Sequence, residues 1–135
     1  MRVFYRSLAG SGEPEEPADG APGVTLLPIP GVRREDPADR PLKGAALEQA
    51  LAGLSLSRDR FGLQDVVLLA QSPFWAPLGA SLRERFGWRT VYDCLDAHEA
   101  FSTNRAGVLE DAERAAASSA ELVVATSEPL RRRMA

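Results

Sequence analysis

Residues 93–99 hold the densest cluster of titratable side chains in the sequence, namely Asp93, Asp96, His98 and Glu99. A carboxylate on a loop can remove a proton from a hydroxyl group, and a histidine can do the same near neutral pH. This segment is therefore the first candidate for chemistry. From spacing alone the alternative stays open that Asp96 and Glu99 are solvated loop acids and that His98 is a surface or capping residue.

Two serines and a tryptophan are further candidates for ligand contacts. Ser72 and Ser127 each precede a predicted helix, and a helix N-cap uses the same groups as an anion site at a helix N-terminus. Capping is the simpler interpretation of both serines. Trp75 can stack on a sugar ring or belong to the core, where we place its neighbour Phe74.

Cys94 and the run Arg131–Arg133 carry less specific signals. Cys94 ends an apolar segment and is predicted to be an inert core thiol. The three arginines could meet phosphate or lipid, but three charges at the start of a helix are more often a solvated face.

Three apolar segments are predicted to be the strands that position these candidates. Residues 66–70 form a continuous apolar run, which is typical of a strand covered on both faces in a parallel sheet. Residues 89–94 and 121–125 are also predicted strands. Ligands of open parallel sheets bind beyond the carboxyl ends of the strands. We therefore expect the candidate residues to gather at one edge of the sheet.

Helices are predicted between these strands. Apolar residues at helical spacing indicate a helix of about three turns through residues 47–54 and another through 109–116. A third helix begins at the possible cap Ser72 and ends at Gly87. Its apolar stripe consists of Phe74, Leu78, Leu82 and Phe86. A final helix follows Ser127.

The N-terminal part of the chain has a weaker pattern. Residues 3–5 are β-prone but few, residues 9–23 are predicted to be a flexible loop, and residues 24–29 form an apolar run typical of a buried strand. Together with the later alternation, this predicts an α/β fold with a parallel sheet and flanking helices. Both ends look cut, so we interpret residues 1–135 as one incomplete domain of a larger protein.

Composition limits the classes of function. The 135 residues suit one domain or a fragment, and the formal charge of −3 argues against nucleic acid as a partner. The single cysteine and single histidine exclude an intramolecular disulfide, a Cys-based zinc site and a multi-His metal site. No apolar run approaches the roughly 20 residues that span a membrane, and no signal peptide is recognised. The expected location is the cytoplasm.

Several common motifs are absent from the sequence. It contains no phosphate-binding loop of the G-x-x-x-x-G-K-[ST] type, no G-x-G-x-x-G fingerprint and no G-x-S-x-G elbow. Their absence disfavours an ATPase, a dinucleotide-dependent dehydrogenase and an α/β-hydrolase. No bound cofactor is expected.

Two segments near the ends of predicted strands carry a recognisable pattern. Residues 90–101 read TVYDCLDAHEAF, and residues 121–130 read ELVVATSEPL. Both segments resemble bacterial glycosyltransferases of the GT-B fold, in particular the N-terminal half of the retaining family 4. Residues 71–75, which read QSPFW, are similar to the family's strand end before a helix. The similarity extends over residues 64–135 and is loose before them.

The chain departs from the family pattern at two positions. Ala97 stands where the family commonly has a second acid, which puts a paired carboxylate in doubt. Glu121 replaces the usual Asp, which is a conservative change.

The resemblance implies the acceptor-side, Rossmann-like domain of a GT-B enzyme, lacking its first strand and its donor-binding C-terminal domain. In the full enzyme, a nucleotide-sugar donor held by that second domain would transfer its sugar to a hydroxyl of a sugar, lipid or small-molecule acceptor. Asp96 would contact or deprotonate this hydroxyl in an inverting enzyme, and Asp96 or His98 would position the substrates in a retaining one. The remaining candidates for substrate contacts are Asp93, Glu99, Ser72, Trp75 and Ser127.

The alternative is a non-catalytic α/β module, derived from such a domain, that binds a partner or a sugar.

A transferase of the GT-B type would work in the cytoplasm or peripherally at the inner face of the membrane. Without its donor-binding domain, we expect the chain alone to be inactive. Without the missing first strand the sheet would expose inner edges, so we also expect the chain to self-associate.

Overall fold

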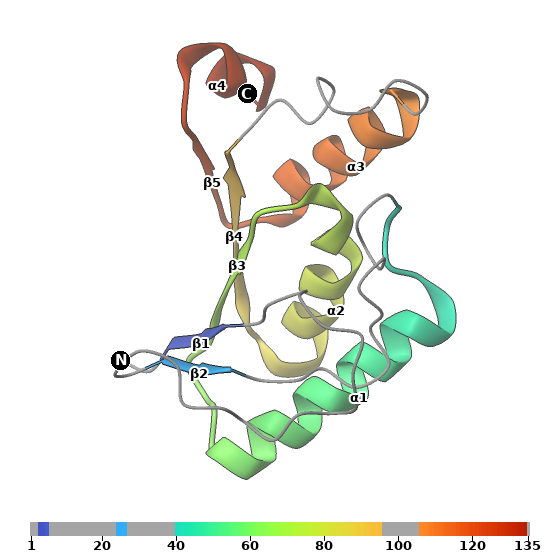
Figure 1. Cartoon of the computed structure of the whole chain (residues 1–135), viewed down its shortest axis with the longest axis vertical. Helices are drawn as coiled ribbons and strands as arrows, with labels where there is room; N and C mark the ends of the chain where they lie inside the picture. The colour runs from blue at the N-terminus through green and yellow to red at the C-terminus, as the bar shows by residue number, and fades with distance from the viewer. Residues whose placement is uncertain (1–2, 6–23, 27–39, 96–105, 135) are drawn as a thin grey trace.

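A computed structural model describes residues 3–5, 24–26, 40–95 and 106–134 of the chain (Figure 1). The elements follow in the order β1 (Val3–Tyr5), β2 (Val24–Leu26), α1 (Gly44–Phe61), β3 (Val67–Ala70), the 3-10 helix η1 (Pro73–Trp75), α2 (Ala76–Phe86), β4 (Arg89–Cys94), α3 (Ala106–Ser119), β5 (Leu122–Ala125) and α4 (Glu128–Met134). Helices and strands alternate from α1 onward, so the described part is a mixed α/β structure.

The strands form two sheets, both parallel. One sheet has the order β3-β4-β5, with β4 in the centre, and the other consists of β1 and β2 alone. The register of the larger sheet sets Leu69 beside Val91 and Val91 beside Leu122. The predicted parallel sheet is confirmed for the segments from 66 onward. The described strands do not form one continuous sheet, because β1 and β2 pair with each other and not with β3.

The helices α1, α2 and α3 stack on one side of the larger sheet (Figure 1). Side chains along β4 alternate accordingly: Thr90, Tyr92 and Cys94 are buried under the helices, whereas Arg89 on the opposite face is exposed. Because successive side chains of a strand point to opposite faces, this alternation defines a covered face and an outer face.

Local signals in the sequence explain where the central helix begins and ends. The Ser72 hydroxyl accepts a hydrogen bond from the Phe74 backbone N–H at 3.4 Å, and Pro73 begins η1. At the other end, Gly87 adopts a left-handed conformation with φ of 69°, and its N–H bonds to the carbonyl of Arg83. A residue without Cβ adopts this conformation at little cost, so the predicted stop at Gly87 is confirmed.

Three clusters of buried side chains form the core between the helices and the sheet. The largest joins α1 to α2 and contains Leu42, Ala50, Leu51, Leu78, Leu82 and Trp88. The second joins β4 to α3 and α4 and contains Ala76, Tyr92, Cys94, Ala116 and Leu130. The third consists of Phe74, Leu109 and Ala112. The predicted apolar stripes therefore do face the core, and Cys94 is the buried thiol that its position predicts.

Two sequence expectations are wrong in detail. The strand at 66–70 is not covered on both faces, because Val67 and Leu69 are 48% and 58% exposed. All five residues of this run are apolar, but only Val66, Leu68 and Ala70 turn toward the helices. The helix predicted at about three turns is longer, since α1 has 18 residues and ends at Gly62 with φ of 60°.

Two other expectations fall outside the described residues. They are the flexible loop 9–23 and the end of the strand predicted at 24–29. Among the described residues, no helix combines the length and hydrophobicity needed to cross a membrane.

Candidate functional site

The carboxyl ends of β3 and β4 bring two polar side chains together. Gln71 directly follows β3, and its Nε2 donates a hydrogen bond to Oδ2 of Asp93 on β4 at 3.1 Å. The register explains the contact, since Ala70 lies beside Tyr92 and the next residues of the two strands are then neighbours. Asp93 is partly exposed, so its carboxylate is fixed by an amide and still open to solvent. Gln71 was not among the predicted site residues, although the strand register could have identified it.

Thr126, directly after β5, is hydrogen-bonded to the end of β4, just before the segment that contains Asp96, His98 and Glu99. The Thr126 hydroxyl donates to the Leu95 carbonyl at 2.7 Å, and the Thr126 backbone N–H donates to the Cys94 carbonyl at 3.4 Å. These bonds fix Leu95, the last described residue before 96–105. Asp96, His98 and Glu99 lie outside the described residues.

The two candidate serines act as helix caps. The Ser127 hydroxyl accepts from the Leu130 backbone N–H at 3.5 Å, as the Ser72 hydroxyl accepts from Phe74. Trp75, left open between core and ligand contact, is partly buried and packs against the cluster that joins α1 to α2. Each of the three residues therefore has a structural role. Each also keeps an exposed or partly exposed surface at this edge of the sheet.

Beneath the edge, Tyr92 and Cys94 form a buried pair on the covered face. Burial, and then the neighbouring Cys94, raise the pKa of the Tyr92 hydroxyl well above its ordinary value. Burial also raises the pKa of the Cys94 thiol. Both groups are therefore held neutral, and Cys94 lacks the thiolate character and access that a nucleophile needs.

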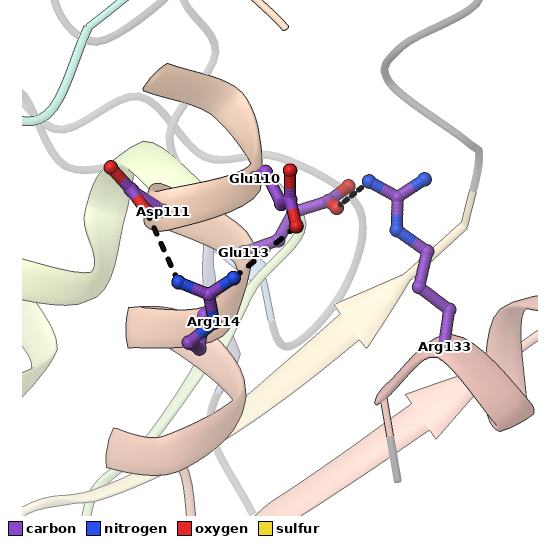
Figure 2. Close-up of polar contacts among 5 residues, drawn as sticks. All are labelled: Glu110, Asp111, Glu113, Arg114 and Arg133. Carbon is purple, nitrogen blue, oxygen red and sulfur yellow. Dashed lines mark hydrogen bonds and ion pairs between the residues drawn. The ribbon is translucent and has the colours of Figure 1, made fainter. Parts of the chain in front are cut away.

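A buried ion pair joins α3 to α4. Arg133 Nη2 donates to Oε2 of Glu113, whose side chain is 3% exposed, while that of Arg133 is 26% exposed. Figure 2 shows the two side chains pointing toward each other from the two helices. The sequence prediction of a solvated arginine face is therefore wrong for Arg133. The signal that was missed is the position of Glu113, which follows Ala112 on the buried side of α3. A buried carboxylate at this position requires a cationic partner.

The remaining arginines near the C-terminus are exposed, as predicted. Arg131 and Arg132 both bond to Glu128, and these two guanidinium groups lower the pKa of the Glu128 carboxyl. On α3, Arg114 bonds to Glu110 and Asp111 at 3.2 Å each (Figure 2). Such exposed pairs contribute little to stability.

An open notch lies between α3 and α4 beside the buried pair. It has a volume of about 510 Å³ and is lined by Glu110, Glu113, Arg114, Ala117, Ser118, Arg133 and Met134. Its charged side chains already form ion pairs with one another. Within the described ranges, no group of three or more His, Cys, Asp or Glu residues could hold a metal ion.

The candidate site is thus the carboxyl edge of the β3-β4-β5 sheet, where Asp93 and Gln71 meet and where the segment with Asp96 and His98 leaves β4. In comparisons with known proteins, no family model matches the chain and no curated protein shows significant similarity to it. The interpretation of the site therefore depends on its own geometry and on the sequence pattern around it.

Proposed function

We propose that this chain is the acceptor-side, Rossmann-like domain of a GT-B glycosyltransferase that uses a nucleotide-sugar donor. The observation that carries the proposal is the Gln71–Asp93 hydrogen bond at the carboxyl edge of a parallel sheet. Open α/β sheets bind their ligands at this edge. The segments that resemble family 4 contain Asp93 and the end of β5, so the resemblance and the geometry point to the same edge.

In this proposal the acceptor lies over the ends of β3 and β4. Asp93, oriented by Gln71, accepts a hydrogen bond from an acceptor hydroxyl, because an ionised carboxylate offers several lone pairs and Gln71 uses one of them. Ser72 and Trp75, at the two ends of η1, border the acceptor. Ser127 and Glu99 complete the proposed set of binding residues.

In this proposal Asp96 and His98 are the catalytic residues that act on the acceptor hydroxyl. Both follow Leu95, whose carbonyl is bonded to Thr126, so the segment leaves the sheet at its carboxyl edge. A carboxylate or an imidazole within reach of the acceptor hydroxyl removes its proton as the glycosidic bond forms. If the reaction retains configuration, the same two residues position the substrates instead. The donor is held by a second domain outside this chain, and the enzyme works in the cytoplasm or at the inner face of the membrane.

The proposal is tested on the natural gene product that contains this chain, incubated with a panel of nucleotide-sugars and cell-derived acceptors. We expect release of nucleoside diphosphate that depends on an acceptor. Asp96→Asn and His98→Ala should each lower kcat by about 100-fold or more, the usual contribution of general acid-base catalysis. Asp93→Asn should raise KM for the acceptor more than it lowers kcat.

Asp65→Asn is the matched control, because Asp65 is an exposed acid just before β3, at the opposite edge of the sheet. It should leave kcat and KM unchanged. Full activity of both Asp96→Asn and His98→Ala would refute the assigned roles. Absence of transfer with every donor, together with saturable binding of a sugar, would favour the non-catalytic binding module instead.

A further inference from the structure

The outer face of the β3-β4-β5 sheet is apolar, and none of the helices in the described residues covers it. Seven large apolar side chains are exposed in the described residues, and four of them belong to these strands, namely Val67, Leu69, Leu122 and Val124. Their exposed fractions range from 41% to 58%. All four belong to the alternate set of positions that faces away from α1, α2 and α3. We call this surface, together with Arg89, Val91 and Asp93 of β4, the bare face.

The register arranges the bare face in rows across the strands. Leu69, Val91 and Leu122 are direct neighbours and form an apolar row through the middle of the sheet. A contiguous exposed apolar surface can serve as an interaction site. A partner that presents apolar side chains in return would remove this row from water.

The two ends of the central strand carry opposite charges. Arg89 lies two residues before Val91, and Asp93 lies two residues after it, so both charges face outward with Val91 between them. Asp93 is oriented by Gln71, and Arg89 has no side-chain hydrogen bond or ion pair to any other described residue. The bare face is thus positive at one end, apolar in the middle and negative at the other end.

We propose that the bare face binds a second copy of this chain through a two-fold axis that runs midway between the two stacked sheets, parallel to their planes and perpendicular to the strands. This symmetry places β4 over β4 of the partner in the opposite direction. Val91 then faces Val91 of the partner subunit, while Arg89 faces Asp93 of the partner subunit and Asp93 faces Arg89 of the partner subunit. An isologous interface requires such a self-complementary surface.

The charges also select this axis over the other face-to-face choice. A two-fold axis parallel to the strands would place Arg89 over its own copy and Asp93 over its own copy. Like charges in direct opposition are unfavourable at an interface. Sheets pack about 10 Å apart, a distance that the long arginine side chain can bridge in the antiparallel arrangement.

The size of the bare face predicts a weak dimer. Three strands about 4.8 Å apart, each about five residues long at about 3.3 Å per residue, cover roughly 14 by 17 Å. Two copies then bury about 500 Å², well below the roughly 1,200–2,000 Å² of stable interfaces. We expect a dissociation constant on the order of 100 μM. The inference does not depend on the proposed transferase activity. In the dimer the Asp93 carboxylate faces Arg89 of the partner subunit, so dimer formation and the proposed acceptor contact exclude each other at this side chain.

Sedimentation equilibrium of the 135-residue chain between about 5 and 500 μM tests the proposal. We expect a reversible monomer–dimer equilibrium. Leu69→Lys should abolish the dimer, because it places a charge in the apolar row. Leu56→Lys is the matched control, since Leu56 is 69% exposed on α1, away from the bare face. It should leave the dissociation constant within about twofold of the starting value.

Charge reversal tests the proposed axis. Arg89→Glu and Asp93→Arg should each raise the dissociation constant about tenfold or more, because each sets two like-charged pairs against each other. The double variant should return within about threefold of the original chain, because both attractive pairs are restored with their signs exchanged. Far-UV circular dichroism checks that every variant is folded, and Arg89→Gln, which only removes the charge, should have an intermediate effect.

Three results would overturn the proposal. The first is a chain that stays monomeric at 500 μM. The second is a dimer that Leu69→Lys leaves intact. The third is a double charge reversal that shows no recovery relative to the two single variants.

Discussion

The two faces of the β3-β4-β5 sheet come from the same strands and differ completely in what covers them. On one face Thr90, Tyr92 and Cys94 are buried under α2 and α3. On the other face Leu69 and Leu122 are more than half exposed. Neighbouring residues along each strand therefore belong to different environments, and hydrophobicity alone does not distinguish them.

The difference shows that an apolar strand side chain stabilises the folded monomer only where a helix covers it. Burial of apolar surface contributes about 25 cal/mol per Å² removed from water. A leucine that stays 58% exposed has realised less than half of that contribution. The remainder is available to a partner, which is why the covered face determines stability and the bare face determines association.

The comparison is tested most strongly by truncating one leucine on each side. Leu82 on α2 is 1% exposed in the core between α1 and α2, so Leu82→Ala should lower the free energy of unfolding by about 3 kcal/mol. Leu69→Ala on the bare face should lower it by less than about 1 kcal/mol. Urea unfolding at about 2 μM, where the proposed dimer is dissociated, measures both values. Equal losses would contradict the distinction between the two faces.

The same contrast applies to charged side chains on α3. Glu113 is buried against Arg133, whereas Glu110 is exposed against Arg114. Glu113→Gln should lower the free energy of unfolding by about 2 kcal/mol, less than a fully buried pair because Arg133 is 26% exposed to solvent. Glu110→Gln should change it by less than about 0.5 kcal/mol. Urea unfolding with and without 1 M NaCl measures both losses of stability. If Glu113→Gln and Glu110→Gln caused equal losses, and 1 M NaCl reduced both alike, the Glu113–Arg133 pair would not be buried in solution.

Alkaline pH should act on the covered side of β4. The pKa of Tyr92 in the folded state lies above its value of about 10 in the unfolded chain, because burial disfavours the phenolate. The unfolded state therefore loses its proton first, and stability falls as the pH rises above 10. Between pH 9 and pH 11 this linkage lowers the free energy of unfolding by about 1.4 kcal/mol.

Absorbance at 295 nm measures the phenolate directly. The chain has two tyrosines, and the signal of one of them should be missing at pH 11 while the protein stays folded. Tyr92→Phe provides the control, since its stability should be less dependent on pH over this range. Titration of both tyrosines near pH 10 in folded protein would contradict the burial of Tyr92.

Much of the fold from residue 40 onward could be predicted from the sequence, because each element carries its own local signal. Helical spacing and Gly87 define α2, the Ser72 cap defines the 3-10 helix η1 before it, and the β-prone segment 89–94 defines β4. The sequence could not predict that β3 is covered on one face only, since Leu68 and Leu69 look alike in a continuous apolar run. That distinction depends on which side of the sheet the helices lie.

The candidate site was predicted less completely than the fold. Its edge of the sheet could be located, because carboxyl ends of parallel strands coincide, and Asp93 was identified there. Its hydrogen bond to Gln71 depends on strand register, which no local pattern in the sequence specifies. The Glu113–Arg133 pair was missed for a related reason, since its two members are 20 residues apart and meet only when α4 packs beside α3.

The smallest expected effect concerns the spacing between α2 and the covered face. Gly79 lies against β4, and a Cβ added there would be 3.0 Å from Thr90 Oγ1 and 3.3 Å from Thr90 Cγ2. Alanine in a helix is favoured over glycine by about 1 kcal/mol, but the close contact with a buried side chain costs about 1–3 kcal/mol. Gly79→Ala should therefore lower the free energy of unfolding by about 1 kcal/mol.

Gly107 on α3 is the matched control for this substitution, because an added Cβ there meets no atom within 4 Å. Gly107→Ala should keep the helix-propensity gain and raise stability by up to about 1 kcal/mol. Thr90→Ala in the Gly79→Ala background should recover part of the loss, since it removes the two atoms closest to the new Cβ. Urea unfolding measures the stability of both variants. If Gly79→Ala stabilised the protein as much as Gly107→Ala, α2 would lie farther from the covered face than the 3.0 Å distance to Thr90 Oγ1 indicates.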